Sequence, residues 1–172
     1  MQPANDGSIP TSIITNRLVL TPLHPDDSTE MVAVLSDASL YEFTGGEPPD
    51  VETLRRRYEA QVAGPDDTSQ AWLNWIIRLG GSGAAVGFVQ ATVAGESADI
   101  AWVVGAAWQR NGYAVEAATA MCNWLRVSGV ASLTAHIHPD HLASAGVASA
   151  CGLRRTDRID ADGECIWTSD GS

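Results

Sequence analysis

Hydrophobic residues in the first third of the chain follow one strand pattern and then two helix patterns. In residues 12–23 ("SIITNRLVLTPL"), Ile14 and two leucines fall on one side and Arg17 on the other, which predicts a strand. Residues 24–40 begin with a proline and two aspartates and continue with an apolar stripe, which predicts a helix with an acidic first turn. A second helix is predicted over residues 51–64, where a glycine marks its end.

A period of two dominates the middle of the chain. Residues 72–79, 84–93 and 98–104 each alternate, with "GGSG" before the second segment and a turn around Gly95 before the third. Three consecutive strands joined by short turns favour an antiparallel meander.

The last third alternates between helix and strand patterns. We expect a helix over 113–128, a strand over 132–138, a short helix over about 141–150 and two short final strands. The complete order predicts a single α/β domain over residues 13–172, with a mixed, mostly antiparallel sheet of about six to seven strands flanked by about four helices. Residues 1–12 show no period and are expected to form a flexible N-terminal segment.

The charge of the chain narrows the function. The 172 residues include no lysine and carry a net charge of −11, which argues against nucleic acid because its binding depends on neutralising phosphates. Residues 24–70 hold eleven acidic and three basic side chains, so this segment either lines the approach of a cationic substrate or forms a solvated face.

No apolar stretch approaches the roughly 18 residues of a membrane span, and no secretory signal is visible, so we expect a cytoplasmic protein without a membrane partner.

Cysteine and histidine spacing gives little support for a metal site. Cys122, Cys151 and Cys165 are widely spaced and are expected to be buried structural thiols. His136 and His138 share one face only if their strand extends to residue 138, and the sequence shows no evident carboxylate partner for them. We therefore predict no bound metal.

A short polar turn, "QRNGYA" at 109–114, stands directly before the helix over 113–128. A helix N-terminus presents unpaired N–H groups and a partial positive charge, which suits a phosphate or pyrophosphate. Here Gly112 lets the backbone approach a ligand, Arg110 adds a charge, and Ala114 leaves space. The turn fits neither common Gly-rich phosphate motif, and a plain strand-to-helix turn is the alternative.

The same turn fits Q/R-x-x-G-x-G/A, the acyl-CoA loop of the GCN5-related N-acetyltransferases, or GNAT proteins. Residues 15–27 are similar to the family's first strand and turn, and residues 98–118 to its fourth strand, loop and third helix. Residues 138–155 resemble its segment H/D-P-x-N-x-x-S and the helix that follows. The chain thus resembles this family over residues 13–168, in particular the branch of ribosomal-protein alanine N-acetyltransferases and its small-molecule relatives.

The resemblance implies where acetyl-CoA binds. In the family, the loop amides wrap the pyrophosphate, and the fourth strand pairs with the pantetheine arm as an added strand would. An N–H in that region also lies near the thioester oxygen. The cofactor-binding residues implied in this way are Trp102, Val103, Val104, Gln109, Arg110, Asn111, Gly112, Tyr113, Ala114 and His141.

Three catalytic side chains are implied as well. Asp99 stands where the branch often has a glutamate, and it would attract an ammonium group and accept its proton, through a water because aspartate is shorter. Ser144 matches a serine thought to protonate the departing sulfur. His141 replaces a cofactor-contacting asparagine and is a second candidate acid, since imidazole titrates near neutrality. The alternatives are local backbone bonding for Asp99 and an ordinary helix-start serine for Ser144.

We therefore expect an acyl-CoA-dependent N-acyltransferase, which transfers acetyl from acetyl-CoA to an amine by direct attack in a ternary complex. The expected acceptor is a cationic small molecule or a peptide N-terminus. The alternative is a non-catalytic acyl-CoA-binding or regulatory module of the same fold. The sequence leaves the oligomeric state open, with a homodimer among the options.

Overall fold

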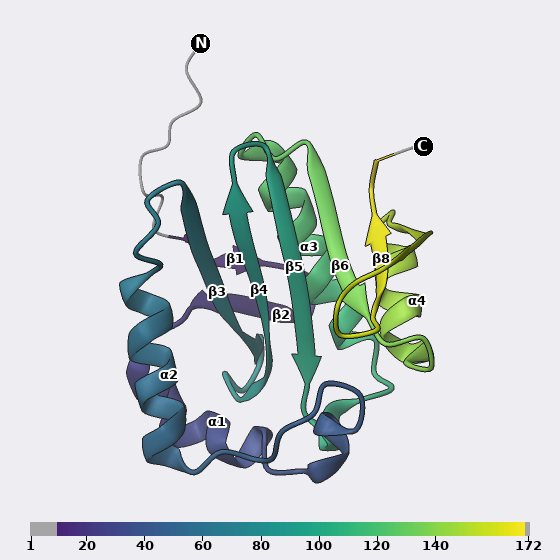
Figure 1. The fold of residues 1–172 in the computed structure, drawn as a ribbon. Helices are drawn as coiled ribbons and strands as arrows, with labels where there is room; N and C mark the ends of the chain where they lie inside the picture. Colours follow the sequence, from purple (N-terminus) through teal and green to yellow (C-terminus); the bar gives the residue numbers. More distant parts are fainter. Residues whose placement is uncertain (1–9, 171–172) are drawn as a thin grey trace.

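Eight strands form one mixed sheet in the computed structural model, which describes residues 10–170 (Figure 1). The strands are β1 (Ile13–Ile14), β2 (Leu18–Pro22), β3 (Gln70–Leu79), β4 (Ala85–Ala94), β5 (Ser97–Val104), β6 (Ser132–Ile137), β7 (Arg154–Ile159) and β8 (Cys165–Thr168). Their order in the sheet is β1-β2-β3-β4-β5-β6-β8-β7. Among the described residues, β5 and β6 form the one parallel pair.

Four α-helices cover the sheet. They are α1 (Ser28–Val34), α2 (Val51–Ala63), α3 (Tyr113–Val127) and α4 (Leu142–Ala150), and short 3₁₀ turns occur at Pro25–Asp27, Ala38–Tyr41 and Ala106–Trp108. Figure 1 shows α3 behind the strands, whereas α1 and α2 belong to the opposite face.

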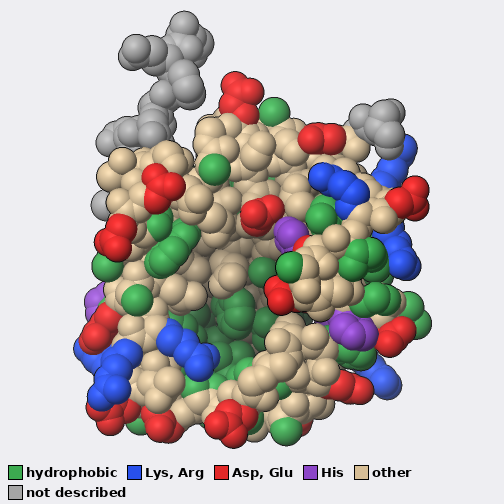
Figure 2. Space-filling model, in the orientation of Figure 1, with side chains coloured by type: hydrophobic (Ala, Val, Ile, Leu, Met, Phe, Trp, Pro, Cys, Tyr) green, Lys and Arg blue, Asp and Glu red, His purple; other side chains and the backbone are tan. Residues whose placement is uncertain are grey.

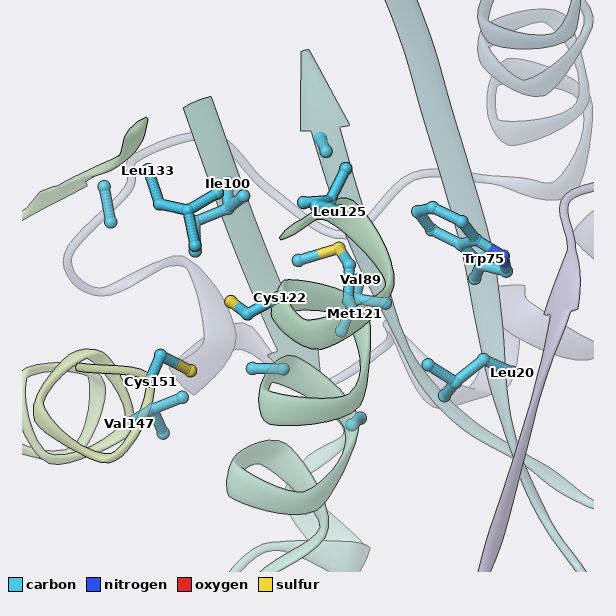
Figure 3. Close-up of a cluster of buried hydrophobic side chains, with 14 of the residues drawn as sticks. Leu20, Trp75, Val89, Ile100, Met121, Cys122, Leu125, Leu133, Val147 and Cys151 are labelled. Atoms are coloured by element: carbon cyan, nitrogen blue, oxygen red, sulfur yellow. The ribbon is translucent and has the colours of Figure 1, made fainter. Parts of the chain in front are cut away.

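The sheet is buried on both faces by two separate apolar clusters. The larger cluster joins the sheet to α3 and α4 and includes Trp75 of β3 and Met121 of α3 (Figure 3). The smaller cluster joins α1 and α2 to the other face, where Ile76 of β3 packs with Met31 and Leu54. Because successive residues of β3 enter opposite clusters, its sequence reads as an almost continuous apolar run.

Several predictions of secondary structure are confirmed. The meander is present, since β3 pairs with β4 and β4 with β5, both antiparallel. The long helix begins at Tyr113 as expected. Helix α2 ends before Gly64, whose φ of 81° is the left-handed conformation that glycine adopts without strain. The predicted α/β class with a mixed, mostly antiparallel sheet and four helices is therefore correct.

The single strand predicted over residues 12–23 is wrong, because the chain turns between β1 and β2. The Thr15 N–H donates to the Leu18 carbonyl (N···O 2.9 Å), and β1 folds back antiparallel onto β2. Ile14 consequently has 79% of its surface exposed instead of facing the core. This split raises the strand number to eight, one more than the upper expectation.

The helix predicted over residues 24–40 is shorter than expected. Its apolar stripe is confirmed, since Met31, Val34 and Leu35 are all buried. However, α1 ends at Val34, and a separate 3₁₀ turn follows, where the Asp37 side chain accepts the Ser39 N–H (2.9 Å). An aspartate that bonds the backbone two residues on favours such a new start over helix continuation.

The predicted flexible segment, residues 1–12, lies largely outside the described residues. At its described end, the Thr11 carbonyl accepts a hydrogen bond from Nε1 of Trp75 (2.9 Å). Within residues 10–170, none of the helices combines the length and the apolar character that crossing a membrane requires.

Candidate active site

Strands β5 and β6 pair only at their first residues and then separate. The last pair joins Asp99 to Thr134. Beyond it, β5 continues to Val104 and β6 to Ile137, and no pairing connects them over these described stretches. Figure 1 shows the two strands spreading apart toward α4. Residues 102–104, predicted to contact pantetheine, lie on this free stretch, where an extended ligand can add like a strand.

The loop after β5 is held together by its own polar side chains. The Gln109 side-chain amide donates to the Val104 carbonyl (Nε2···O 3.1 Å). The Asn111 side-chain amide donates to the carbonyls of Trp108 (2.9 Å) and Gln109 (3.1 Å). These bonds fix the path of the loop. The N–H groups of Trp108 and Gln109 donate to the carbonyls of Gly105 and Ala106, whereas those of residues 110–112 are left for another partner.

The first turn of α3 is free of a side-chain cap. Gly112 occupies the N-cap position with φ 78°, and Arg110 has φ 64°, so both adopt the left-handed conformation. For a residue with a side chain, that conformation is disfavoured by roughly 1–2 kcal/mol. No side chain accepts a hydrogen bond from the first-turn N–H groups at this cap. Uncapped first-turn N–H groups suit an anion, and an anion site at residues 109–114 stays a prediction.

Arg17 adds a second positive charge to this loop, which the sequence analysis did not predict. Its Nη1 donates to the Asn111 carbonyl (2.8 Å), and its Nε lies 2.7 Å from Oε2 of Glu116 in α3. The guanidinium also stands over the Tyr113 ring, 4.8 Å from its centroid. The turn between β1 and β2 places Arg17 beside the loop. A contact between residues 94 positions apart has no local sequence signal that could predict it.

A cavity of about 520 Å³ lies beside the separating strands, on the sheet face that carries α1 and α2. Figure 2 shows a hollow at the centre of the visible face, with hydrophobic side chains on its floor. The cavity is lined by Phe43, Thr44, Gln90, Thr92, Asp99, Ile100, Ala101, His136, His138, Asp162 and Glu164. Its charged lining residues are three carboxylates and no arginine, so the cavity favours a cation.

The acidic segment, residues 24–70, does not supply these carboxylates. Among the described residues it contributes only Phe43 and Thr44 to the lining. Its acids bond within the protein instead: Asp26, Asp27, Glu30, Glu52 and Glu59 pair with arginines, and Asp37, Asp50 and Asp67 accept backbone N–H groups. The carboxylates of this cavity therefore come from Asp99 of β5 and from the β7–β8 turn, and not from residues 24–70.

His136 has two carboxylate partners that are not evident from the sequence. Its Nδ1 lies 2.7 Å from Oδ2 of Asp160, in the β7–β8 turn, and its Nε2 lies 4.0 Å from Oδ1 of Asp99. One nitrogen of His136 and one carboxylate oxygen each from Asp160 and Glu164, the atom types that bind metal ions, lie within 4.8 Å of one another. Strand β6 ends at Ile137, so His138 falls outside it.

The predicted catalytic residues fall into two places. Asp99 lines the cavity at the last β5–β6 pair, whereas His141 and Ser144 belong to the start of α4 and do not line it. The His141 ring stacks on Phe43 with centroids 4.5 Å apart. Burial, followed by the charge of His138, lowers the pKa of His141 below its usual range, so this imidazole is neutral at pH 7.

The three cysteines are free and buried, as expected from the sequence. Cys122 and Cys151 lie in the apolar cluster between α3 and α4 (Figure 3). Neither they nor Cys165 lines the cavity of about 520 Å³.

Known structures share this architecture. The microcin C7 self-immunity acetyltransferase MccE, in complex with acetyl-CoA and AMP, has a TM-score of 0.75 at 16% identity, covering 95% of this chain and 98% of that chain. AAC(6')-Ib, in complex with paromomycin and acetyl-CoA, has a TM-score of 0.73 at 17% identity, covering 89% and 92%. A candidate ribosomal-protein-serine acetyltransferase from Vibrio cholerae has a TM-score of 0.72 at 18% identity, covering 98% of each chain.

Sequence comparison identifies the family. Among curated protein sequences, no significant match is found. A family model described as the GNAT acetyltransferase domain matches residues 17–154, most of the chain. The match includes β5, the uncapped loop and the start of α4, which together form the candidate site. The chain therefore belongs to the GNAT acetyltransferase family.

Proposed function

We propose that this protein transfers an acetyl group from acetyl-CoA to the amine of a cationic acceptor by direct attack. One observation carries the proposal. The gap between β5 and β6 has an uncapped helix N-terminus at one end and an acidic cavity beside it. A thioester extending along β5 from that helix N-terminus would reach the cavity next to Asp99, where an amine can meet it.

Acetyl-CoA supplies the activated acetyl group, and residues of this chain fit its anionic part. The uncapped N–H groups at Gly112 and the guanidinium groups of Arg17 and Arg110 suit a pyrophosphate. A Cβ added at Gly112 would lie 3.3 Å from Nη2 of Arg17, so glycine keeps this corner open. Beyond Asp99, the edge of β5 that faces β6 is unpaired, so backbone groups on this edge can pair with the pantetheine amides.

The acceptor site favours an ammonium group. Asp99, Asp162 and Glu164 surround the cavity, and its volume of about 520 Å³ is within the usual range for small-molecule sites. An alkylamine has a pKa near ~10.4 and is mostly protonated at neutral pH, so carboxylates attract it. The open side of the cavity suits either a small cationic molecule or a peptide N-terminus.

We assign three side chains to the reaction. Asp99 attracts and holds the ammonium, because its carboxylate lines the cavity. Ser144, in the first turn of α4, stabilises the departing thiolate by a hydrogen bond. The lowered pKa of His141 favours a hydrogen-bonding contact with the cofactor over the role of a cationic acid.

Thiol release from acetyl-CoA tests the proposal. We suggest a panel of spermidine, an aminoglycoside and an alanyl peptide with a free N-terminus, with the N-acetylated peptide as a matched negative control. We expect turnover of a cationic amine and a fall in kcat/KM of roughly 10²-fold in Asp99→Asn. Asp157→Asn, on exposed strand β7, is the control variant. Acetyl-CoA binding without transfer to any amine would instead indicate a non-catalytic acyl-CoA-binding module.

A further inference from the structure

The cavity contains a histidine whose orientation is fixed by a carboxylate. Nδ1 of His136 and Oδ2 of Asp160 are 2.7 Å apart. The other oxygen of Asp160, Oδ1, accepts the backbone N–H groups of Asp162 and Glu164, both at 2.9 Å. Asp160 is therefore anchored in the β7–β8 turn, and β8 pairs with β6, the strand that carries His136.

Ionisation of Asp160 sets the tautomer of the ring. The Glu164 N–H, and next the His136 ring, hold the pKa of Asp160 below its usual range, so this carboxylate is ionised at neutral pH. An ionised carboxylate only accepts hydrogen bonds, so Nδ1 of His136 must donate. In the neutral ring, Nε2 then carries the free lone pair.

That lone pair faces the acceptor cavity. Nε2 lies 4.0 Å from Oδ1 of Asp99, and both residues line the cavity. Asp99 belongs to the last β5–β6 pair, so the two groups stand where the strands begin to separate. The titratable groups that face the ring are Asp99 from β5, Asp160, Asp162 and Glu164 from the β7–β8 turn, and His138 beyond β6.

Imidazole is a better base than a carboxylate for removing a proton from the acceptor ammonium. Ordinary pKa values are ~3.9 for aspartate and ~6.5 for histidine, against ~7.7–8.0 for an α-amino group. Proton transfer is most efficient when the base titrates near the working pH. A carboxylate beside the lone pair attracts the ammonium, and the ring can accept the proton.

We propose that Nε2 of His136 is the base that takes the proton from the acceptor ammonium, that Asp160 is the positioning residue, and that Asp99 holds the ammonium. The inference rests on the proposed acetyl transfer. The ammonium gives one proton to Nε2, and its nitrogen forms a bond to the thioester carbonyl carbon while the C–S bond breaks. The nitrogen's second proton goes to the departing sulfur, and His136 releases its proton to water.

The ring itself is tested by long-range ¹H–¹⁵N NMR of the protein alone, labelled at histidine. We expect the neutral His136 ring to carry its proton on Nδ1, and Asp160→Asn to shift the tautomer toward Nε2–H. A ring protonated on Nε2 in the wild type overturns the proposal whether or not an acceptor is known.

The chemical role is tested with acetyl-CoA and the amine of the panel that is turned over best. His136→Gln should lower kcat/KM by roughly 10²–10⁴-fold and remove the acid limb of its pH profile, with acetyl-CoA affinity unchanged. His24→Gln, which alters an exposed histidine outside the cavity, should retain both. An unchanged acid limb in His136→Gln overturns the proposal that His136 is the base. If the wild type does not bind acetyl-CoA at all, the proposed function is overturned instead.

Discussion

Arg17, in the turn between β1 and β2, and Glu116, in the first turn of α3, form an ion pair with Nε and Oε2 2.7 Å apart. Glu116 also accepts the backbone N–H of Arg17 (2.9 Å) and the Thr15 hydroxyl (2.7 Å). The N-terminal hairpin is thus fixed to the helix that begins at the 109–114 loop. The hairpin and the loop form one unit, although 99 residues separate Arg17 from Glu116.

Replacing Arg17 should weaken acetyl-CoA binding. We expect Arg17→Ala to raise the Kd by about 10-fold or more, because a hydrogen bond to a charged group contributes ~1.5–3 kcal/mol. Calorimetric titration of acetyl-CoA measures the change. Arg56→Ala is a matched control, since Arg56 pairs with Glu52 on the exposed surface of α2. Equal affinities in the two variants would remove Arg17 from the cofactor site.

Acid should weaken the link between the hairpin and α3. Burial acts to raise the pKa of Glu116, but hydrogen bonds from Thr15 and Arg17 outweigh it and lower the pKa. A folded pKa below the unfolded value stabilises the protein at neutral pH, and this contribution is lost as the pH falls through the folded pKa. We expect Glu116→Gln to lower the free energy of unfolding by about 1–2 kcal/mol at pH 7 and by less near pH ~3. Urea unfolding of the wild type and Glu116→Gln at both pH values measures this difference in stability. A difference that is the same at both pH values would contradict the prediction.

The close approach of β4 to β5 should not tolerate a side chain at Gly87. A Cβ there would lie 2.1 Å from the Val103 carbonyl oxygen and 2.9 Å from Cα of Val104. We expect Gly87→Ala to destabilise the protein by about 1–3 kcal/mol and to weaken acetyl-CoA binding by displacing the free stretch of β5. Gly146→Ala, in α4 with nothing within 4 Å, should be neutral or stabilising by about 0.5–1 kcal/mol. Urea unfolding compares the stabilities of Gly87→Ala and Gly146→Ala. Equal free energies of unfolding would contradict this prediction, because they would show that β5 can move to accommodate the added methyl group.

His141 should resist protonation. Burial, and next the charge of His138, lower its pKa, so the folded protein binds this proton less readily than the unfolded chain does. Stability from the neutral ring should therefore be lost as the pH falls from near ~6.5 through the folded pKa. NMR titration should give a midpoint below that of a histidine peptide, and Phe43→Leu, which removes the stacked ring, should raise it. A midpoint at or above the peptide value would contradict the burial argument.

Much of the cofactor side of the site could be predicted from the sequence, because its parts are adjacent along the chain. The strand over 98–104, the polar turn and the helix from Tyr113 follow one another, and each has its own period or turn signal. The turn inside residues 12–23 could not be predicted, because an alternating pattern does not show where the strand ends. At this turn the Thr15 hydroxyl accepts the Leu18 N–H.

The acceptor side depends on contacts between distant segments, which periodicity does not reveal. Asp160 reaches His136 from 24 residues away because β8 pairs with β6 and places the β7–β8 turn over the cavity. Similarly, the number of acids in residues 24–70 left open whether this segment lines the approach of a cationic substrate or forms a solvated face. The structure shows that most of them bond to arginines or helix starts.

Calorimetric titration of acetyl-CoA into three proteins tests the central claim, that the uncapped loop before α3 binds the cofactor. Gly112→Glu places a carboxylate at the N-terminus of α3, whereas Gly129→Glu places the same side chain at a glycine of positive φ just beyond its C-terminus. Both glycines have a positive φ, 78° at Gly112 and 101° at Gly129, a conformation in which any side chain is strained. The account predicts micromolar binding by the wild type and Gly129→Glu, and no binding by Gly112→Glu. Equal binding by all three proteins, or none by the wild type, would contradict it.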